Sequence, residues 1–153
     1  MKIRSRRSGD MAFCVTALAT VHEADGYPAL WPEDPAAWLH SATQVAAWVA
    51  ESNDRIVGHL ALDLVDDGLM VSRLFVRPEC RGTGAAAALL DAAVAYAAER
   101  SVAIELHVEQ GSAAAIAFYE KSGWVRAGTE PADWMLPDGR RAVEHRYVPA
   151  PGR

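Results

Sequence analysis

Hydrophobic positions along the chain fall into runs with two different spacings. Alternating or compact apolar runs predict strands over residues 2–7, 44–51, 55–64, 69–76, 103–108, 124–129 and 142–148. Helical spacing and helix caps predict helices over residues 11–24, 35–41, 85–98 and 112–121. The resulting order, β-α-α-β-β-β-α-β-α-β-β, predicts an α/β fold with a mixed sheet (α+β mixed sheet).

Turn and cap residues separate these elements. Asp10 is a suitable N-cap for the helix that begins at residue 11, and Asp34 followed by Pro35 is typical of a helix start. Gly58, inside a predicted strand, indicates a bulge. Turns are expected at residues 52–54, 66–68 and 137–139, and a helix end at Gly123.

Length and composition narrow the class of protein. The chain has 153 residues, so we expect a single domain over residues 1–153, with a frayed tail at 149–153. Hydrophobic residues make up 51% of the sequence and charged residues 23%, as in globular proteins. The formal net charge of −5 argues against a nucleic-acid partner and mildly favours a cationic substrate.

Three features bear on location and metal binding. Basic residues 2–7 and the apolar stretch 11–21 resemble a signal peptide, but Gly9 and Asp10 divide the two parts and favour a helix start. No apolar run reaches the roughly 18 residues of a membrane span. Two cysteines, Cys14 and Cys80, make no disulfide framework, and the scattered histidines make no metal site. We therefore expect a cytoplasmic protein with no membrane or metal partner.

The segment Arg81-Gly82-Thr83-Gly84-Ala85-Ala86 stands between a predicted strand and a predicted helix. The first N–H groups of a helix have no partner within it, and these donors suit an anion such as phosphate. Gly82 and Gly84 allow a ligand to approach the backbone closely, and Arg81 adds a cation. The spacing matches neither Gly-x-x-x-x-Gly-Lys nor Gly-x-Gly-x-x-Gly. The segment predicts an anion-binding loop, with a plain turn as the alternative.

Two motifs resemble those of the GCN5-related N-acetyltransferase (GNAT) family. Arg81, Gly84 and Ala86 fit its Arg/Gln-x-x-Gly-x-Gly/Ala loop for the acyl-CoA diphosphate. Further along, residues 112–124 are similar to a second signature, in which an Asn-x-x-Ala helix ends in Tyr-x-x-x-Gly-Phe. Ser112 stands where Asn is usual, and a tryptophan replaces the Phe. Because the element order also agrees, the resemblance covers about residues 2–148.

The resemblance implies a sheet splayed at its centre and transfer of an acetyl group from acetyl-CoA to a primary amine. The acceptor would be a small molecule, a peptide or a protein, attacking directly in a ternary complex, and homodimers are expected in this family. The alternative is a CoA-binding sensor or interaction module without catalysis, which the Ser112 departure favours. The residues expected to bind the cofactor are Leu74, Phe75, Val76, Arg81, Gly82, Thr83, Gly84, Ala85, Ala86, Ser112 and Tyr119.

Tyr119 and His107 are the expected catalytic residues. Tyr119 matches the motif position at the end of the helix beside the thioester and would protonate the departing thiolate; a core tyrosine is the alternative. An ammonium must lose a proton before it attacks. His107 lies where some GNAT enzymes carry a glutamate base, and an unperturbed imidazole is mostly neutral at pH 7; a structural histidine is the alternative. Glu105, Ser72 and a water relay are further candidates for the base.

The acceptor itself is not specified by any motif. Residues 26–41 hold three prolines and the aromatic residues Tyr27, Trp31 and Trp38. These rings either pack beneath the segment or form a wall of the acceptor cleft. Arg73 likewise faces either the cleft or solvent. We expect substrate specificity to lie in this segment and in the final hairpin.

Overall fold

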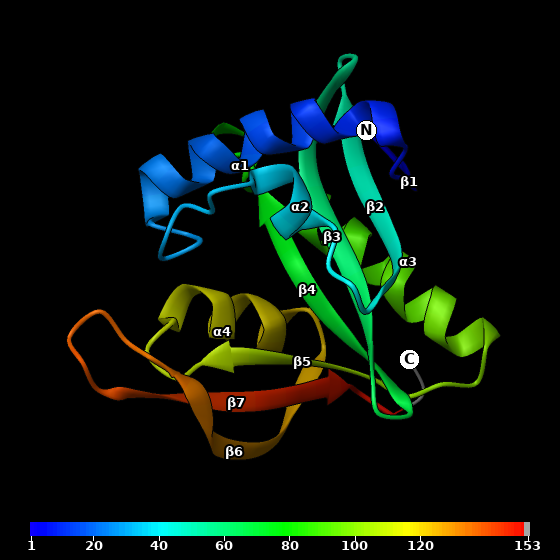
Figure 1. Ribbon diagram of the computed structural model, residues 1–153. Coiled ribbons are helices and arrows are strands. Elements are labelled where there is room, and N and C mark those ends of the chain that lie inside the picture. Colours follow the sequence, from blue (N-terminus) through cyan, green and yellow to red (C-terminus); the bar gives the residue numbers. More distant parts are fainter. Residues whose placement is uncertain (152–153) are drawn as a thin grey trace.

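A seven-stranded sheet organises the computed structural model, which describes residues 1–151 (Figure 1). Its strands lie in the order β1-β2-β3-β4-β5-β7-β6, and β4–β5 is the parallel pair among antiparallel neighbours. The strands are β1 (Lys2–Ser5), β2 (Gln44–Ser52), β3 (Arg55–Val65), β4 (Gly68–Val76), β5 (Ile104–Glu109), β6 (Trp124–Met135) and β7 (Arg141–Pro149).

Helices cover both faces of this sheet. They are α1 (Met11–Asp25), α2 (Pro35–Leu39), α3 (Ala85–Glu99) and α4 (Ala113–Lys121), with short 3₁₀ turns at Ser8–Asp10 and Pro78–Cys80. The order of strands and α-helices confirms the order expected from the sequence, and the mixed sheet confirms the fold class.

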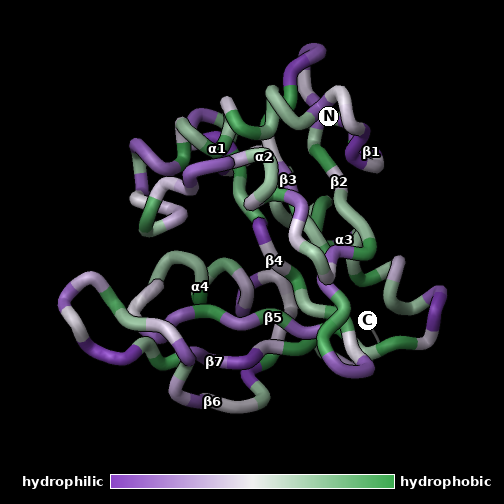
Figure 2. The backbone as a smooth tube through the Cα atoms, viewed as in Figure 1, coloured by the Kyte–Doolittle hydropathy of each residue, from purple (hydrophilic) through white to green (hydrophobic). Residues whose placement is uncertain are grey.

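Two hydrophobic clusters lie on opposite faces of the sheet. On one face, α1 buries residues such as Cys14 and Leu18 against Phe75 of β4. On the other face, α3 buries Leu89 and Leu90, and α4 packs beside them against β5 and β7. Figure 2 shows the hydrophobic colour along α3 and α4 and the hydrophilic colour at the β6–β7 turn. The β2–β4 part of the sheet is therefore enclosed between α1 and α3, and α4 covers the β5–β7–β6 part on the same face as α3.

Gly58 brings α3 close to the sheet. A Cβ at this position would lie 3.2 Å from Cδ1 of Leu89 and 3.3 Å from the Phe75 carbonyl oxygen. The expected irregularity lies next to it, because the β2–β3 register shifts between Ala50 and Glu51. A larger residue at Gly58 would push α3 away from β3.

Strands β4 and β5 separate soon after they meet. Leu69 pairs with Ile104 and Met70 with Glu105, and the register records no further pair between the two strands. Figure 1 shows β4 and β5 diverging from this point into a V. Backbone groups of a strand point alternately to its two neighbours. The divergence therefore turns part of the β4 backbone toward the space between the strands, and it confirms the expected splay.

A bulge interrupts β4 within the diverging part. His59 of β3 pairs with Phe75, but Ala61 pairs with Ser72, so residues 73–74 together oppose a single residue of β3. We call residues 73–74 the β4 bulge. Arg73 has φ = 52°, in the left-handed region that non-glycine residues rarely occupy. Figure 2 shows a hydrophilic stretch at this place in an otherwise hydrophobic strand.

Several predicted boundaries are wrong, and one predicted cap is confirmed in its position but not in its hydrogen bond. β1 ends at Ser5 and α2 at Leu39, both earlier than expected, while β6 continues to Met135 because it pairs along the length of β7. Asp10 does precede α1, but its carboxylate makes no cap hydrogen bond to that helix. It accepts instead from the Arg4 guanidinium and from the Arg7 backbone N–H.

Within residues 1–151, no helix is both long enough and apolar enough to cross a membrane.

Candidate active site

Residues 81–86, which we call the phosphate loop after their predicted ligand, begin with a stretch that is open to solvent. Residues 81–84 are exposed, and Gly82 and Gly84 have φ of 79° and 86°. A Cβ at either glycine would meet no atom within 4 Å. Gly84 is the N-cap of α3 and provides no side chain to its first N–H groups. The loop therefore presents bare backbone donors at the start of a long helix, as a diphosphate requires.

Arg81 is held at the edge of this loop by α1. Its guanidinium forms an ion pair with Asp25, the last residue of α1. This pairing raises the pKa of Arg81. Both side chains remain partly exposed, at 49% and 40%. Arg81 is thus close to the loop but engaged with a carboxylate that an anionic ligand would have to displace.

The β4 bulge is clamped by side chains from distant segments. Arg73 Nε donates to the Trp38 carbonyl oxygen at 3.1 Å, and its guanidinium carbon lies 3.9 Å from the centre of the Trp38 ring. The Arg73 carbonyl oxygen lies 2.8 Å from Nδ1 of His59. Of the expected cofactor residues beside it, Leu74 is half-buried, while Phe75 and Val76 are buried. Residues 75 and 76 therefore have only their backbone to offer a ligand.

Tyr119 lies on α4, packed against the core beneath β5 and β7. Its ring lies 5.5 Å from that of Phe118 and 6.4 Å from that of Tyr147, whose hydroxyl donates to Glu120 and so ties α4 to β7. Burial, with a smaller effect of the nearby Tyr27, raises the pKa of Tyr119 above its ordinary value. Within residues 1–151 its hydroxyl makes no hydrogen bond. The phenol is thus held protonated, with a proton to donate.

His107 lies on the opposite face of β5 from Tyr119. Its neighbours Leu106 and Val108 are buried toward α4, whereas the His107 side chain is 35% exposed. His107 Nε2 lies 2.6 Å from Oε2 of Glu105. A carboxylate only accepts, so Nε2 carries the proton and Nδ1 is the basic nitrogen. Nδ1 lies 3.6 Å from Glu144 Oε1, beside a small hollow lined by His107, Glu130, Pro131, Glu144 and Arg146.

The other sequence candidates are less well placed. Ser72 donates to Asp63 Oδ2 at 2.6 Å, which engages its hydroxyl away from the β4–β5 space. Glu105 serves as the partner of His107. Ser112, at the start of α4, is exposed and makes no side-chain cap bond.

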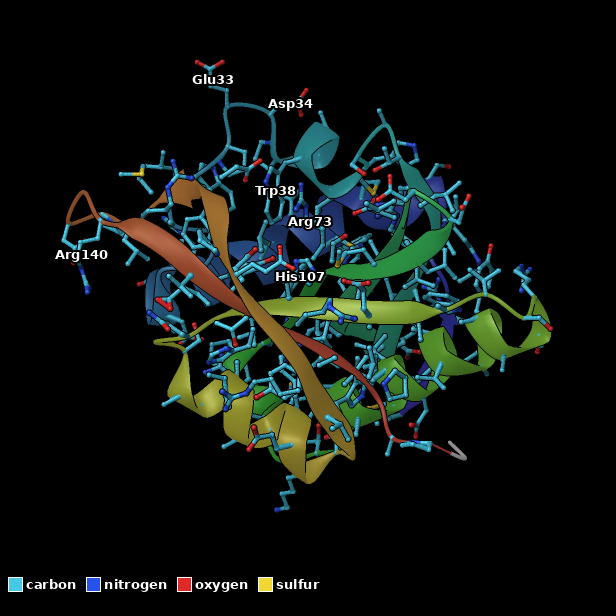
Figure 3. The ribbon with its side chains drawn as sticks, turned by 90° about the horizontal axis from the view of Figure 1, so that it is seen from below. Glu33, Asp34, Trp38, Arg73, His107 and Arg140 are labelled. Atoms are coloured by element: carbon cyan, nitrogen blue, oxygen red, sulfur yellow. The ribbon has the colours of Figure 1, made fainter. Side chains whose placement is uncertain are left out.

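Aromatic residues from the α1–α2 segment pack together beside the β4 bulge. Tyr27 packs edge-on against Trp38, with ring centres 6.0 Å apart, and His22 Nδ1 lies 2.8 Å from the Pro28 carbonyl oxygen. Desolvation of its hydroxyl raises the pKa of Tyr27 to about 12, although the residue as a whole is 37% exposed. Figure 3 shows Trp38, Arg73 and His107 in succession between α2 and β5, whereas Glu33, Asp34 and Arg140 point outward. The structure places Trp38 beside Arg73.

Residues 15–124 match the model of the acetyltransferase (GNAT) family. The chain belongs to the GNAT family. An uncharacterised N-acetyltransferase of Mycobacterium tuberculosis is 38% identical over 86 residues, which are 55% of this chain and 55% of the relative. The chain thus matches about half the length of that curated relative.

Solved structures confirm the GNAT fold. The ribosomal-protein-S18-alanine N-acetyltransferase of Escherichia coli has a TM-score of 0.75 at 22% identity, covering 97% of this chain and 92% of that chain. A spermidine N-acetyltransferase of Vibrio cholerae, in complex with CoA and spermine, has a TM-score of 0.74 at 20% identity, covering 96% and 94%. At these identities the likeness shows the fold.

Three residues on or next to the supports of the β4 bulge were not assigned from the sequence. Tyr27 and Trp38 had two open interpretations, and nothing in the local sequence marks His59 as a partner of the β4 bulge. The polar pair Ser72-Arg73 inside an apolar strand is the one signal that could have indicated the bulge.

Proposed function

We propose that this chain is an acetyl-CoA-dependent N-acetyltransferase that acts on a primary amine in a ternary complex. One observation carries the proposal: a GNAT chain presents an open loop of backbone donors immediately after the strand that diverges from β5. We further propose that residues 1–153 form one GNAT domain and that the enzyme works in the cytoplasm, where the free cysteines Cys14 and Cys80 stay reduced. Oligomeric state stays a prediction.

The residues present fit the donor acetyl-CoA, which supplies the acetyl group as a thioester. The phosphate loop would hold its diphosphate, because the two open glycines leave room for the phosphate oxygens. Arg81 would leave Asp25 to join it, as a cation beside an anion. The β4 backbone in the diverging region would hold the pantetheine amides and the thioester carbonyl. Ser112 would sit at the α4 end of this path.

His107 and Tyr119 would divide the proton transfers between the two faces of β5. His107 Nδ1 would take the ammonium proton, and Glu144 would stabilise the imidazolium that results. As the N–C bond forms and the C–S bond breaks, the Tyr119 hydroxyl would give its proton to the departing sulfur. Because the pKa of Tyr119 is raised, its hydroxyl would still carry this proton when the C–S bond breaks. The surplus proton of the nitrogen would then return to the Tyr119 oxygen through water, which leaves a neutral amide, a thiol and a protonated tyrosine. The two groups therefore act at opposite sides of the reacting carbon.

The acceptor we propose carries positive charge. The hollow beside His107 is lined by two carboxylates, Glu130 and Glu144, which pair directly across β6 and β7, and by one guanidinium, that of Arg146, so negative charges outnumber positive ones. Like charges at this distance repel, and a cation between them relieves the repulsion. The structural relatives include one named for spermidine and one named for a protein alanine, so polyamines and peptide N-termini are the first acceptors to test.

The decisive experiment combines calorimetry with a thiol-release assay. We expect CoA and acetyl-CoA to bind the wild-type chain, and acetyl-CoA to release thiol with an amine from a panel of polyamines, amino acids, aminoglycosides and alanine-terminated peptides. His107→Gln should keep the CoA dissociation constant and lower kcat by about 10²-fold or more.

Three results would contradict parts of the proposal. Binding of CoA with no thiol release across the panel would support a non-catalytic sensor instead. Failure of millimolar CoA to raise the melting temperature would remove the CoA site altogether. A wild-type kcat in His107→Gln would show that His107 is not the base and would favour a water relay.

A further inference from the structure

A fully buried histidine outside the proposed catalytic pair contacts the β4 bulge. His59 of β3 is 0% exposed, and its ring stacks on that of Phe75 with centres 5.1 Å apart and planes at 14°. Its Nε2 lies 2.9 Å from Nη1 of Arg6, and its Nδ1 lies 2.8 Å from the Arg73 carbonyl oxygen. The imidazole thus bridges a cation beyond β1 and the backbone of the bulge.

These two partners determine the tautomer of His59. A guanidinium has only donors, so Nε2 must accept from Arg6, and the ring proton must lie on Nδ1. Nδ1–H therefore donates to the Arg73 carbonyl oxygen. Burial, assisted by the charges of Arg6 and Arg73, lowers the pKa of His59 to about 4, so the ring stays neutral near pH 7.

Arg6 is itself held in place by the end of α2 and by β2. Its Nη1 donates to the Leu39 carbonyl oxygen at 3.0 Å, and its Nη2 contacts His40 Nδ1 at 2.9 Å and Gln44 Oε1 at 2.6 Å. The chain of contacts from Arg6 through His59 to the bulge is therefore anchored at both ends. This series of contacts therefore resists rotation of the peptide group whose carbonyl belongs to Arg73.

The geometry points to His59 as a positioning residue for the thioester carbonyl: it fixes the peptide between Arg73 and Leu74, and that peptide's N–H is the donor to the carbonyl. A peptide unit is planar and trans, so the Arg73 C=O and the Leu74 N–H point in opposite directions. Holding the oxygen against β3 and α1 directs the N–H away from them, toward the space where β4 leaves β5. The left-handed φ of Arg73 makes this support necessary.

This inference rests on the proposed acetyl transfer, and its test separates the two. His59→Leu removes the donor to Arg73, whereas His59→Gln keeps one acceptor and one donor. His145→Leu is the matched control, because His145 is a buried histidine on β7, two strands away from β4, and is bonded to Thr129. For each variant that melts above the assay temperature, three quantities are measured. They are the dissociation constant of CoA, the infrared stretch of acetyl-CoA carrying a ¹³C-labelled carbonyl, and kcat.

We expect His59→Leu to bind CoA within about twofold of wild type, because the phosphate loop is untouched. The bound carbonyl should lose its shift to lower frequency, and kcat should fall roughly 10-fold or more, since removal of one such donor costs about 10²–10³. His59→Gln should recover much of both, and His145→Leu should match wild type. If His59→Leu does not fold, Arg6→Gln replaces it, with the same expected direction.

A wild-type carbonyl shift and kcat in folded His59→Leu would overturn the inference. If the wild-type chain binds no acetyl-CoA, the proposed function fails instead. The role of His59 in positioning the peptide is then tested on the Leu74 amide alone. Its exchange rate and nitrogen chemical shift, measured without ligand, should differ between wild type and His59→Leu and agree between wild type and His145→Leu. No difference at Leu74 would reject the role of His59 independently of catalysis.

Discussion

The phosphate loop and the β4 bulge are both built from unusual backbone, but they are supported in opposite ways. The loop uses glycines at positive φ, lies in solvent, and has one ion pair to α1. The bulge uses Arg73 at positive φ and is clamped by Trp38, His59 and, through His59, by Arg6. An anion bound by several donors tolerates small displacements, whereas a reacting carbonyl does not. We infer that rigidity is concentrated where the proposed bond changes would occur.

The largest effect is expected on kcat, from the substitution Tyr119→Phe. Loss of the hydroxyl removes the proton donor, and kcat should fall by about 10²-fold or more while the CoA dissociation constant holds. Tyr147→Phe is the control, since it deletes a neighbouring hydroxyl that bonds Glu120 instead. Because the pKa of Tyr119 is raised, the wild-type kcat should not decline on the alkaline side below about pH 10. Full turnover of Tyr119→Phe, where chemistry limits the rate, would remove the residue from the mechanism.

Burial of His59 against the β4 bulge should also make the free energy of unfolding depend on pH. The pKa of His59 is about 4, below its ordinary 6.5, so between these values the unfolded chain binds a proton that the folded chain refuses. The stabilisation is present above pH 6.5 and is lost as the pH falls toward 4, by about 3 kcal/mol. Urea unfolding at both pH values should show this loss in wild type and a smaller one in His59→Gln. Equal losses in the two proteins would mean that other groups cause the acid sensitivity.

The same contrast explains what the sequence could predict. The phosphate loop is contiguous, and its predicted function depends on a strand end, two glycines and a helix start, so residues 81–86 can be proposed from the local sequence. Tyr119 was predicted from the same kind of local motif. The element order followed from hydrophobic spacing for the same reason, although β6 was predicted too short because its pairing with β7 sets its length.

The β4 bulge could not be predicted in this way. Its supports come from Arg6, Trp38 and His59, which meet Arg73 only after β1, α2 and β3 have assembled. Asp10 shows the same limit on a smaller scale: it is a favourable cap by type, but Arg4 and the Arg7 N–H take its carboxylate. Where a side chain has several possible partners, the tertiary structure determines which of them it contacts.

A smaller effect is expected from side chains added to the phosphate loop. Gly82→Val and Gly84→Val place a branched residue at left-handed φ and cover the backbone donors, so the CoA dissociation constant should rise roughly 10-fold as several N–H contacts weaken. Gly139→Val is the matched control, at φ = 87° on the β6–β7 turn with open space around it. All three should lose a similar 1–3 kcal/mol or so of stability. Calorimetry showing equal CoA affinity in all three would place the diphosphate elsewhere.

The smallest effect is expected from removing the ion pair that Arg81 of the phosphate loop forms with Asp25. Asp25→Asn removes the carboxylate that holds Arg81, and the freed guanidinium should tighten CoA binding. An ion pair this exposed is worth about 0–1 kcal/mol, so we expect the dissociation constant to fall by no more than about fivefold. Glu23→Gln, which removes the same charge from an exposed site on α1, is the control and should change affinity less. The difference between the two variants should shrink as salt is raised, because screening weakens exposed pairs. Weaker binding in Asp25→Asn would show that Asp25 holds Arg81 in the orientation that the diphosphate requires, so that the pair assists the loop rather than competing with its ligand.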